Sequence, residues 1–87
     1  MNYEQRYYQI IYIDLTNVNW NKDDNGYTFD DTFLDQYCNR IPIHRREEFK
    51  KIVYERILFI KASRRNIYNK TEMVLSEFGT LVSIEGF

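Results

Sequence analysis

Two side chains in this sequence have the chemistry of a nucleophile and its base: the single cysteine, Cys38, and the single histidine, His44. A thiol attacks a substrate when a nearby imidazole takes its proton and a third group orients that imidazole. Cys38, however, follows Tyr37 on the apolar face of a predicted helix, where a free cysteine is usually a small core residue. His44 comes just after Pro42, where a capping or surface role is expected. We therefore expect no catalytic residue and no enzyme activity.

The sequence also offers poor ligand sets for metals and nucleotides. Zinc needs about four nitrogen or sulfur ligands, and the chain has one Cys and one His. Its three glycines, Gly26, Gly79 and Gly86, do not form a phosphate-binding loop. Residues 21–26, NKDDNG, resemble the first half of a calcium loop, but the twelfth position is Thr32 instead of Glu. We expect no metal and no cofactor.

Length and composition favour one small binding domain spanning residues 1–87. A chain of 87 residues has room for one core, and its eight Tyr, six Phe and one Trp can fill it or serve partner contacts. The single cysteine, the lack of a signal-peptide pattern and the lack of a long apolar stretch predict a cytoplasmic protein that does not enter a membrane. The abundance of Ile, Asn and Tyr is typical of an AT-rich coding sequence, as in a low-GC bacterium or its phage.

The first half of the chain predicts a strand, a turn and a helix. Residues 7–15, YYQIIYIDL, are β-branched and aromatic on both faces, which is typical of a central strand covered on both sides. Asn25-Gly26 predicts a type I′ turn, in which both central residues have positive φ, within either a hairpin or a longer connection that returns at residues 27–29. Apolar spacing then predicts a helix over about 31–40 that stops before Pro42.

The second half predicts a long helix, a short helix and a closing strand. Glu47 and Glu48 at the start, and basic residues with Asn66 at the end, suit a helix dipole and a C-cap. A strand within residues 52–60 is the alternative, because β-branched residues are frequent there. Asn69-x-x-Glu72 resembles a capping box for a helix over 70–78, ending at Gly79. Residues 80–84 are predicted to pair with the N-terminal strand.

The candidate core face of the long helix spans about 160°. It contains Phe49, Ile52, Val53, Ile57, Phe59 and Ile60. Arg56 falls within this face, so it should meet a carboxylate such as Asp14 or Asp35 unless the face is partly open. On the opposite side, Tyr54, Leu58 and Ala62 form a stripe that predicts a protein contact, including self-association.

Charge is distributed unevenly along the chain. Residues 1–40 carry seven acids and three bases, whereas residues 41–87 carry six acids and nine bases. Five carboxylates fall within thirteen residues and form what we call the acidic stretch: Asp23, Asp24, Asp30, Asp31 and Asp35. On one surface they would imitate the negative charge of a nucleic-acid backbone and occupy a basic channel. Turn formation and helix capping are the alternative roles for the same residues.

The basic residues support the opposite hypothesis, direct binding of nucleic acid. Phosphates would be contacted by basic side chains and bases would stack on Tyr54 and Tyr68. The basic set is Arg45, Arg46, Lys50, Lys51, Lys61, Arg64, Arg65 and Lys70. Interrupting glutamates and a pI of 5.8 make direct nucleic-acid binding the second choice.

Together these features predict an α+β domain in which a central N-terminal strand pairs with a C-terminal strand and packs against two or three helices. The expected function is that of a non-catalytic, protein-binding inhibitor from a phage or mobile element, of the anti-CRISPR or anti-restriction type. Its partner would be a basic nucleic-acid enzyme, contacted through the acidic stretch. A second interface would involve Tyr54, Leu58, Arg64 and Arg65. The alternatives are a nucleic-acid-binding regulator and a homodimeric adaptor or structural subunit.

Overall fold

The structure is a computed structural model that describes residues 9–63 and 70–87, and the chain divides into two units. The first unit comes from residues 1–16 and 69–87, and the second from residues 17–68. The first contains β1 (Gln9–Asp14), β4 (Lys70–Leu75), η4 (Ser76–Phe78) and β5 (Thr80–Glu85). The second contains β2 (Asn21–Asp23), β3 (Gly26–Thr28), η2 (Asp31–Tyr37), η3 (Ile43–Arg45) and α1 (Arg46–Ala62).

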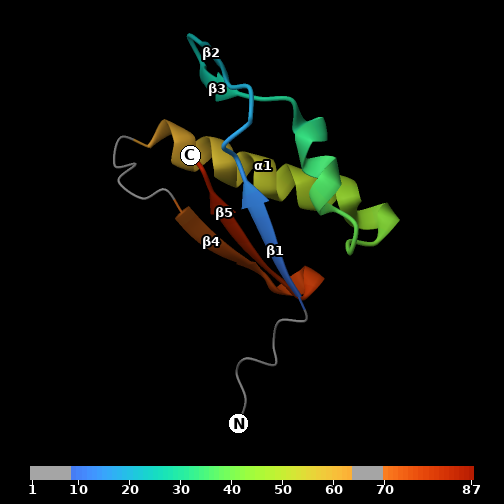
Figure 1. Ribbon diagram of the computed structural model, residues 1–87. Coiled ribbons are helices and arrows are strands. Elements are labelled where there is room, and N and C mark those ends of the chain that lie inside the picture. The colour runs from blue at the N-terminus through green and yellow to red at the C-terminus, as the bar shows by residue number, and fades with distance from the viewer. Residues whose placement is uncertain (1–8, 64–69) are drawn as a thin grey trace. The chain divides into compact units, whose positions relative to one another are not determined.

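The sheet of the first unit has the order β1-β5-β4 among the described residues, with β1 parallel and β4 antiparallel to β5 (Figure 1). The predicted pairing of the N-terminal and C-terminal strands and the α+β class are confirmed. The central strand, however, is β5 and not the N-terminal strand. β5 pairs with β1 on one side and with β4 on the other, so β1 is an edge strand. Val82 and Ile84 of β5 are fully buried. The Gln9 side-chain amide donates to Thr80 Oγ1 at 2.8 Å and links β1 to β5.

The expectation that the N-terminal strand is covered on both sides is wrong. Ile11 and Ile13 are buried, but Ile10 is 45% exposed and Tyr12 is 67% exposed. Alternate side chains of a strand point to opposite faces of the sheet. One face of β1 is therefore apolar and open.

Residues 70–75 form a strand, so the helix predicted over 70–78 is wrong. The apparent capping box begins at Asn69, which lies outside the described residues, and Glu72 belongs to β4. Pairing with β5 along six residues outweighs the local capping pattern, and Thr71 and Val74 are β-branched residues that suit a strand. Gly79 caps η4 in the left-handed conformation at φ 64°, as predicted for a C-cap.

The predicted hairpin is confirmed as β2–β3, but its turn lies one residue earlier than expected. Asp23 pairs with Gly26, so Asp24 and Asn25 are the two turn residues. Among the described residues only glycines have positive φ, which excludes the type I′ turn proposed for Asn25-Gly26. Gly26, at φ 119°, supplies the positive φ directly after the turn.

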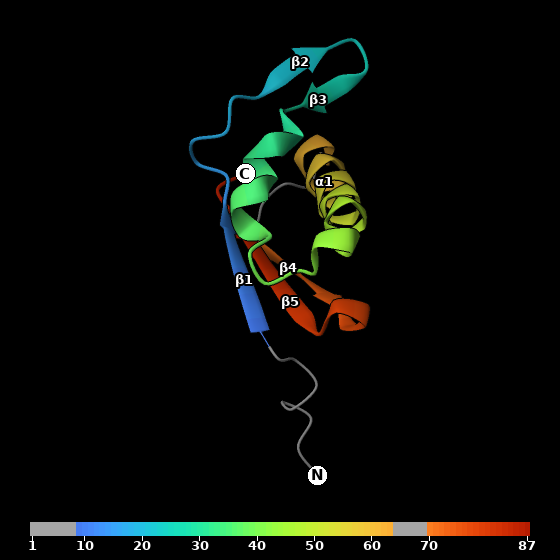
Figure 2. The ribbon, with the colours of Figure 1, turned by 90° about the vertical axis from the view of Figure 1, so that its right-hand side faces the viewer.

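Both helices predicted in the second unit are present, but each is shorter than predicted. Residues 31–37 form the 3-10 helix η2 instead of a longer α-helix, and η2 lies alongside α1 (Figure 2). The long helix is confirmed as α1, which excludes the alternative strand. It ends at Ala62 with Ser63 as its C-cap, while the predicted cap, Asn66, lies outside the described residues.

The buried face of α1 is narrower than predicted and is rotated about the helix axis. Phe49, Val53 and Ile57 are fully buried, at intervals of four residues, but Phe59 is 69% exposed. Arg56 is exposed, and its guanidinium lies 5.9 Å from the Phe59 ring centroid. A buried carboxylate partner for Arg56 is therefore unnecessary. The buried face is rotated toward Tyr54, because β3 and η2 contact α1 on the side of the helix that carries Tyr54.

Candidate functional site

Six aromatic rings of the second unit form a continuous cluster centred on Phe29. The Phe29 ring lies 4.7 Å from Tyr54, 5.3 Å from Trp20 and 6.3 Å from Phe33, measured between centroids. Trp20 also contacts Tyr27, and Phe33 contacts Tyr37. All five of these contacts are edge-to-face or tilted and none is a face-to-face sandwich, which the ring quadrupole disfavours. Phe29 is 5% exposed, so the cluster joins the hairpin, η2 and α1 around one buried ring.

The helical position of Tyr54 predicted a solvent-facing stripe, but Tyr54 does not belong to one in the structure. Its hydroxyl oxygen accepts the Phe29 backbone N–H at 3.4 Å, and its ring is half-buried against Phe29. One edge of Tyr54 remains beside Leu58, which is also half-buried, whereas Ala62 is exposed. The aromatic cluster thus fixes the orientation of Tyr54.

An open groove of about 520 Å³ lies between η2 and α1, and we call it the η2–α1 groove. Its lining residues are Asp31, Glu47, Lys50, Lys51, Tyr54, Glu55 and Leu58. The groove brings together Asp31 from the acidic stretch and Tyr54 and Leu58 from the predicted second interface. The sequence placed these residues on two separate surfaces. In the structure they line one concavity that has carboxylates beside an apolar pair.

Lys50 lies at the centre of the charges in this groove. Its ammonium is 2.7 Å from Asp35 Oδ1 and 3.7 Å from Glu47 Oε2, and its side chain is 12% exposed. The hydrogen bond with Asp35 raises the pKa of Lys50 above its ordinary value of 10.5, so Lys50 is positively charged at neutral pH. Asp31 adds to this field. Lys50 therefore offsets part of the negative charge that η2 contributes.

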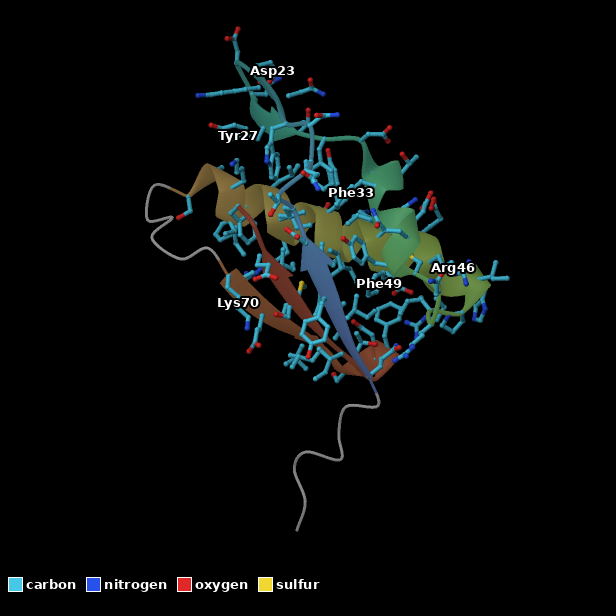
Figure 3. The ribbon with its side chains drawn as sticks, in the orientation of Figure 1. Asp23, Tyr27, Phe33, Arg46, Phe49 and Lys70 are labelled. Atoms are coloured by element: carbon cyan, nitrogen blue, oxygen red, sulfur yellow. The ribbon has the colours of Figure 1, made fainter. Side chains whose placement is uncertain are left out.

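The aspartates of the acidic stretch divide into two groups. Asp23 and Asp24 lie at the hairpin tip, and the Asp23 carboxylate accepts the Asn25 backbone N–H at 2.8 Å. Figure 3 shows Asp23 at this tip, away from the helix that carries Phe33. Asp30, Asp31 and Asp35 belong to η2 and its N-cap. Only Asp31 lines the groove, and Asp23, Asp30 and Asp35 each have a local structural role as well.

Several basic residues are held by neighbouring groups. Arg45 forms an ion pair with Glu48 at 3.1 Å, and Arg46 Nε donates to the Ile41 carbonyl at 2.9 Å. Lys61 Nζ lies 4.6 Å from the Trp20 ring and 5.2 Å from the Tyr27 ring, a cation–π arrangement. Arg64, Arg65 and Tyr68 lie outside the described residues, and Lys70 belongs to β4 in the first unit.

Cys38 is a core residue, as predicted. It is 2% exposed, and its thiol donates to the Leu34 carbonyl at 3.4 Å. Burial raises the pKa of the thiol above its ordinary value of 9.0, so the nucleophilic thiolate is disfavoured. His44 is exposed in η3. Within residues 9–63 and 70–87, no group of three or more His, Cys, Asp or Glu side chains is arranged to hold a metal ion.

No family model, curated protein or solved structure matches this chain. In the described parts of the chain, no helix has both the length and the apolar character needed to span a membrane.

Two features of this site are absent from the predictions made from the sequence: the Lys50–Asp35 pair and the burial of Phe29. The signal that could have indicated a local cluster is the presence of five aromatic residues between positions 20 and 37, although which ring is central depends on the tertiary fold. The Lys50–Asp35 pair joins residues on different helices, so no helical spacing rule reports it.

Acid stability should depend on Asp30. Its carboxylate accepts the Thr32 backbone N–H at 3.0 Å, and this interaction lowers its pKa below the ordinary value of 3.8. The folded state then binds this proton less tightly than the unfolded state, so the stabilisation is full above the unfolded pKa and is lost as pH falls through the folded pKa. In thermal unfolding followed by circular dichroism, Asp30→Ala should lower Tm at neutral pH, and its difference from the parent should shrink as the pH falls below 3.8. A difference that stays constant as the solution is acidified through this range would contradict the assignment.

Proposed function

We propose that this chain is a non-catalytic protein-binding module that docks on a basic surface of a nucleic-acid-processing enzyme and inhibits it by occlusion. This is the mode of action expected of a phage or mobile-element inhibitor of the anti-CRISPR or anti-restriction type, working in the bacterial cytoplasm. The observation that supports it is the η2–α1 groove, where acidic side chains and a fixed apolar pair line one concavity.

The chemistry of the groove suits a segment that carries both Lys or Arg and one apolar side chain. Asp31, Glu47 and Glu55 supply carboxylates, while Tyr54 and Leu58 supply apolar surface. Buried aromatic anchors surrounded by polar groups are typical of binding hot spots. The Tyr54 ring loses little freedom on binding, because Phe29 already holds it.

A protein partner fits this groove better than a nucleic acid does. The groove has three carboxylates and two lysines, and Lys50 is already paired with Asp35. Phosphates would meet net negative charge there, since nucleic-acid binding depends on displacing counterions with free basic groups. The carboxylates at the hairpin tip extend the negative potential of the same unit and would speed encounter with a basic surface.

A peptide titration followed by ¹⁵N–¹H NMR tests the groove. We expect a lysine-rich peptide of about 14 residues with one central leucine to shift resonances of η2 and α1, and a matched glutamate-rich peptide to leave them unchanged. The double variant Asp31→Asn/Glu55→Gln should weaken binding at least about fivefold, that is, by about 1 kcal/mol. The control Glu72→Gln/Glu77→Gln, which neutralises two exposed carboxylates outside the groove, should bind like the parent.

Equal affinity of the parent and Asp31→Asn/Glu55→Gln would overturn the assignment of the groove. If a DNA duplex shifts the resonances of Arg45, Arg46 and Lys51 and the peptide shifts no resonance, the nucleic-acid-binding alternative is favoured instead. The same three proteins, immobilised against a low-GC bacterial lysate, test the partner class. The proposal requires a captured nucleic-acid enzyme that added duplex DNA displaces and that the groove variant fails to retain.

A further inference from the structure

We propose that the open face of the β1-β5-β4 sheet is a self-association surface, on which a second copy of this chain packs face to face. The two copies would be related by a two-fold axis parallel to the strands. This surface belongs to the first unit, whereas the η2–α1 groove belongs to the second. The inference is therefore independent of the proposed function.

An exposed apolar patch occupies one end of this face. The strand register places Ile10, Leu81 and Val74 side by side across the three strands. Ile10 is 45% exposed, Val74 is 51% exposed, and Tyr12 in the next row is 67% exposed. Only five large hydrophobic residues are exposed in the described part of the chain, and three of them lie in this patch. Such clustering marks an interaction site more strongly than scattered exposed residues do.

The other end of the face is charged. There the register places Asp14, Glu85 and Lys70 side by side across the three strands. Between the two ends lies the row of Tyr12, Ser83 and Glu72. The face thus changes along the strands from an apolar row, through a polar row, to a row with both signs of charge.

A two-fold axis parallel to β5 makes this arrangement complementary to itself. Such a rotation keeps each row opposite the same row but exchanges the outer strands, so β1 faces the β4 of the second copy. Ile10 then faces Val74 of the second copy, and Asp14 faces Lys70 of the second copy, each contact occurring twice. Aligned sheets in a sandwich pack with their strands within about 30°, so these rows stay in correspondence near the axis.

The same rotation also accounts for the middle row and excludes the opposite orientation. Tyr12 faces Glu72 of the second copy, where the phenol can donate to the carboxylate. Glu85 faces Glu85 of the second copy, and the Lys70 side chains of both copies flank this pair and limit the repulsion between the two carboxylates. A two-fold axis perpendicular to the strands would instead place the apolar row against the charged row. Burying charged groups against apolar side chains is unfavourable.

The size of the face sets the expected affinity. Its three rows contain nine side chains in each copy, fewer than the roughly 20–30 residues per side of a standard interface. We therefore expect a dissociation constant of about 10–100 μM, equivalent to about 5–7 kcal/mol.

Sedimentation velocity of the full chain between about 5 μM and 1 mM tests the proposal, with Ile10→Glu, Val74→Lys and their combination. Each single variant should weaken the dimer at least tenfold. The combined variant should recover much of the loss, because Glu at position 10 would face Lys at position 74 of the second copy. Phe59→Lys, on the exposed side of α1, is the control and should dimerise like the parent.

A parent that remains monomeric at 1 mM, or a dimer that Ile10→Glu and Val74→Lys leave intact, would overturn the proposal. Circular dichroism verifies that each variant is folded. If either substitution unfolds the chain, Lys70→Glu probes the charged row instead, because Lys70 is exposed at the sheet edge. It should weaken the dimer at low ionic strength, and an unchanged dimer would count against the proposed register.

Discussion

Replacing Phe29 with alanine should lower the free energy of unfolding by about 3–5 kcal/mol. Phe29 is 5% exposed, and its ring contacts Trp20, Phe33 and Tyr54. Removing the ring leaves a cavity and separates the three rings that surround it. Small domains have a total stability of about 5–15 kcal/mol, so the variant should be near the limit of folding.

Trp20 is the only tryptophan and lies 5.3 Å from Phe29, so its fluorescence reports this cluster directly. Urea unfolding followed by that fluorescence should show a midpoint lower by about 1–5 M. Phe29→Leu fills part of the cavity and should lose less, and Phe59→Ala, which truncates an exposed ring, should lose little. A Phe29→Ala midpoint close to that of Phe59→Ala would show that the cluster does not support the fold. Because Phe29 also fixes Tyr54, the variant should lose groove affinity as well.

Replacing Ile84 with alanine should cost about 2–5 kcal/mol. Ile84 is fully buried on β5, and this strand pairs with both of its neighbours. The register places Ile84 between Ile13 of β1 and Thr71 of β4. A cavity there should weaken both strand pairs together.

Amide hydrogen exchange measures this effect strand by strand. Protection in β1, β4 and β5 should fall by a common factor in Ile84→Ala, because all three strands depend on the same buried layer. Ile84→Val removes one methyl group and should cost about 0.5–1.5 kcal/mol. A loss of protection confined to β4 would mean that β1 is held without β5, contrary to the observed pairing.

The sequence predicted the elements with strong and continuous patterns. The β-branched run of residues 7–15 favours a strand, and the apolar spacing of α1 favours a helix, each over many residues. Residues 70–75 were misassigned because Asn69 and Glu72 match a capping box, whereas the strand depends on pairing with β5. The turn was misplaced by one residue because Gly26 accommodates positive φ on either side of the tip.

The groove could be predicted only in part. Asp31, Tyr54 and Leu58 were selected individually, from charge and helical position. Their common location depends on how η2 lies along α1, which the Phe29 cluster and the Lys50–Asp35 pair determine. The Phe29–Tyr54 contact and the Lys50–Asp35 pair each join segments distant in sequence. For Arg56 the structure shows the second alternative, an open part of the helix face, because a helical wheel gives the relative positions of side chains but not the direction in which the core lies.

The parallel pairing of β1 with β5 has a consequence for synthesis on the ribosome. Gln9 and Thr80, which hydrogen-bond to each other, are separated by 71 positions, so the sheet cannot be completed until β5 has left the exit tunnel. Until then β1, an apolar strand, emerges without its partner, while local contacts already allow α1 to form. The nascent chain therefore presents an unpaired β-edge to the cell throughout translation of its second half, the state in which chaperone binding and aggregation compete with folding.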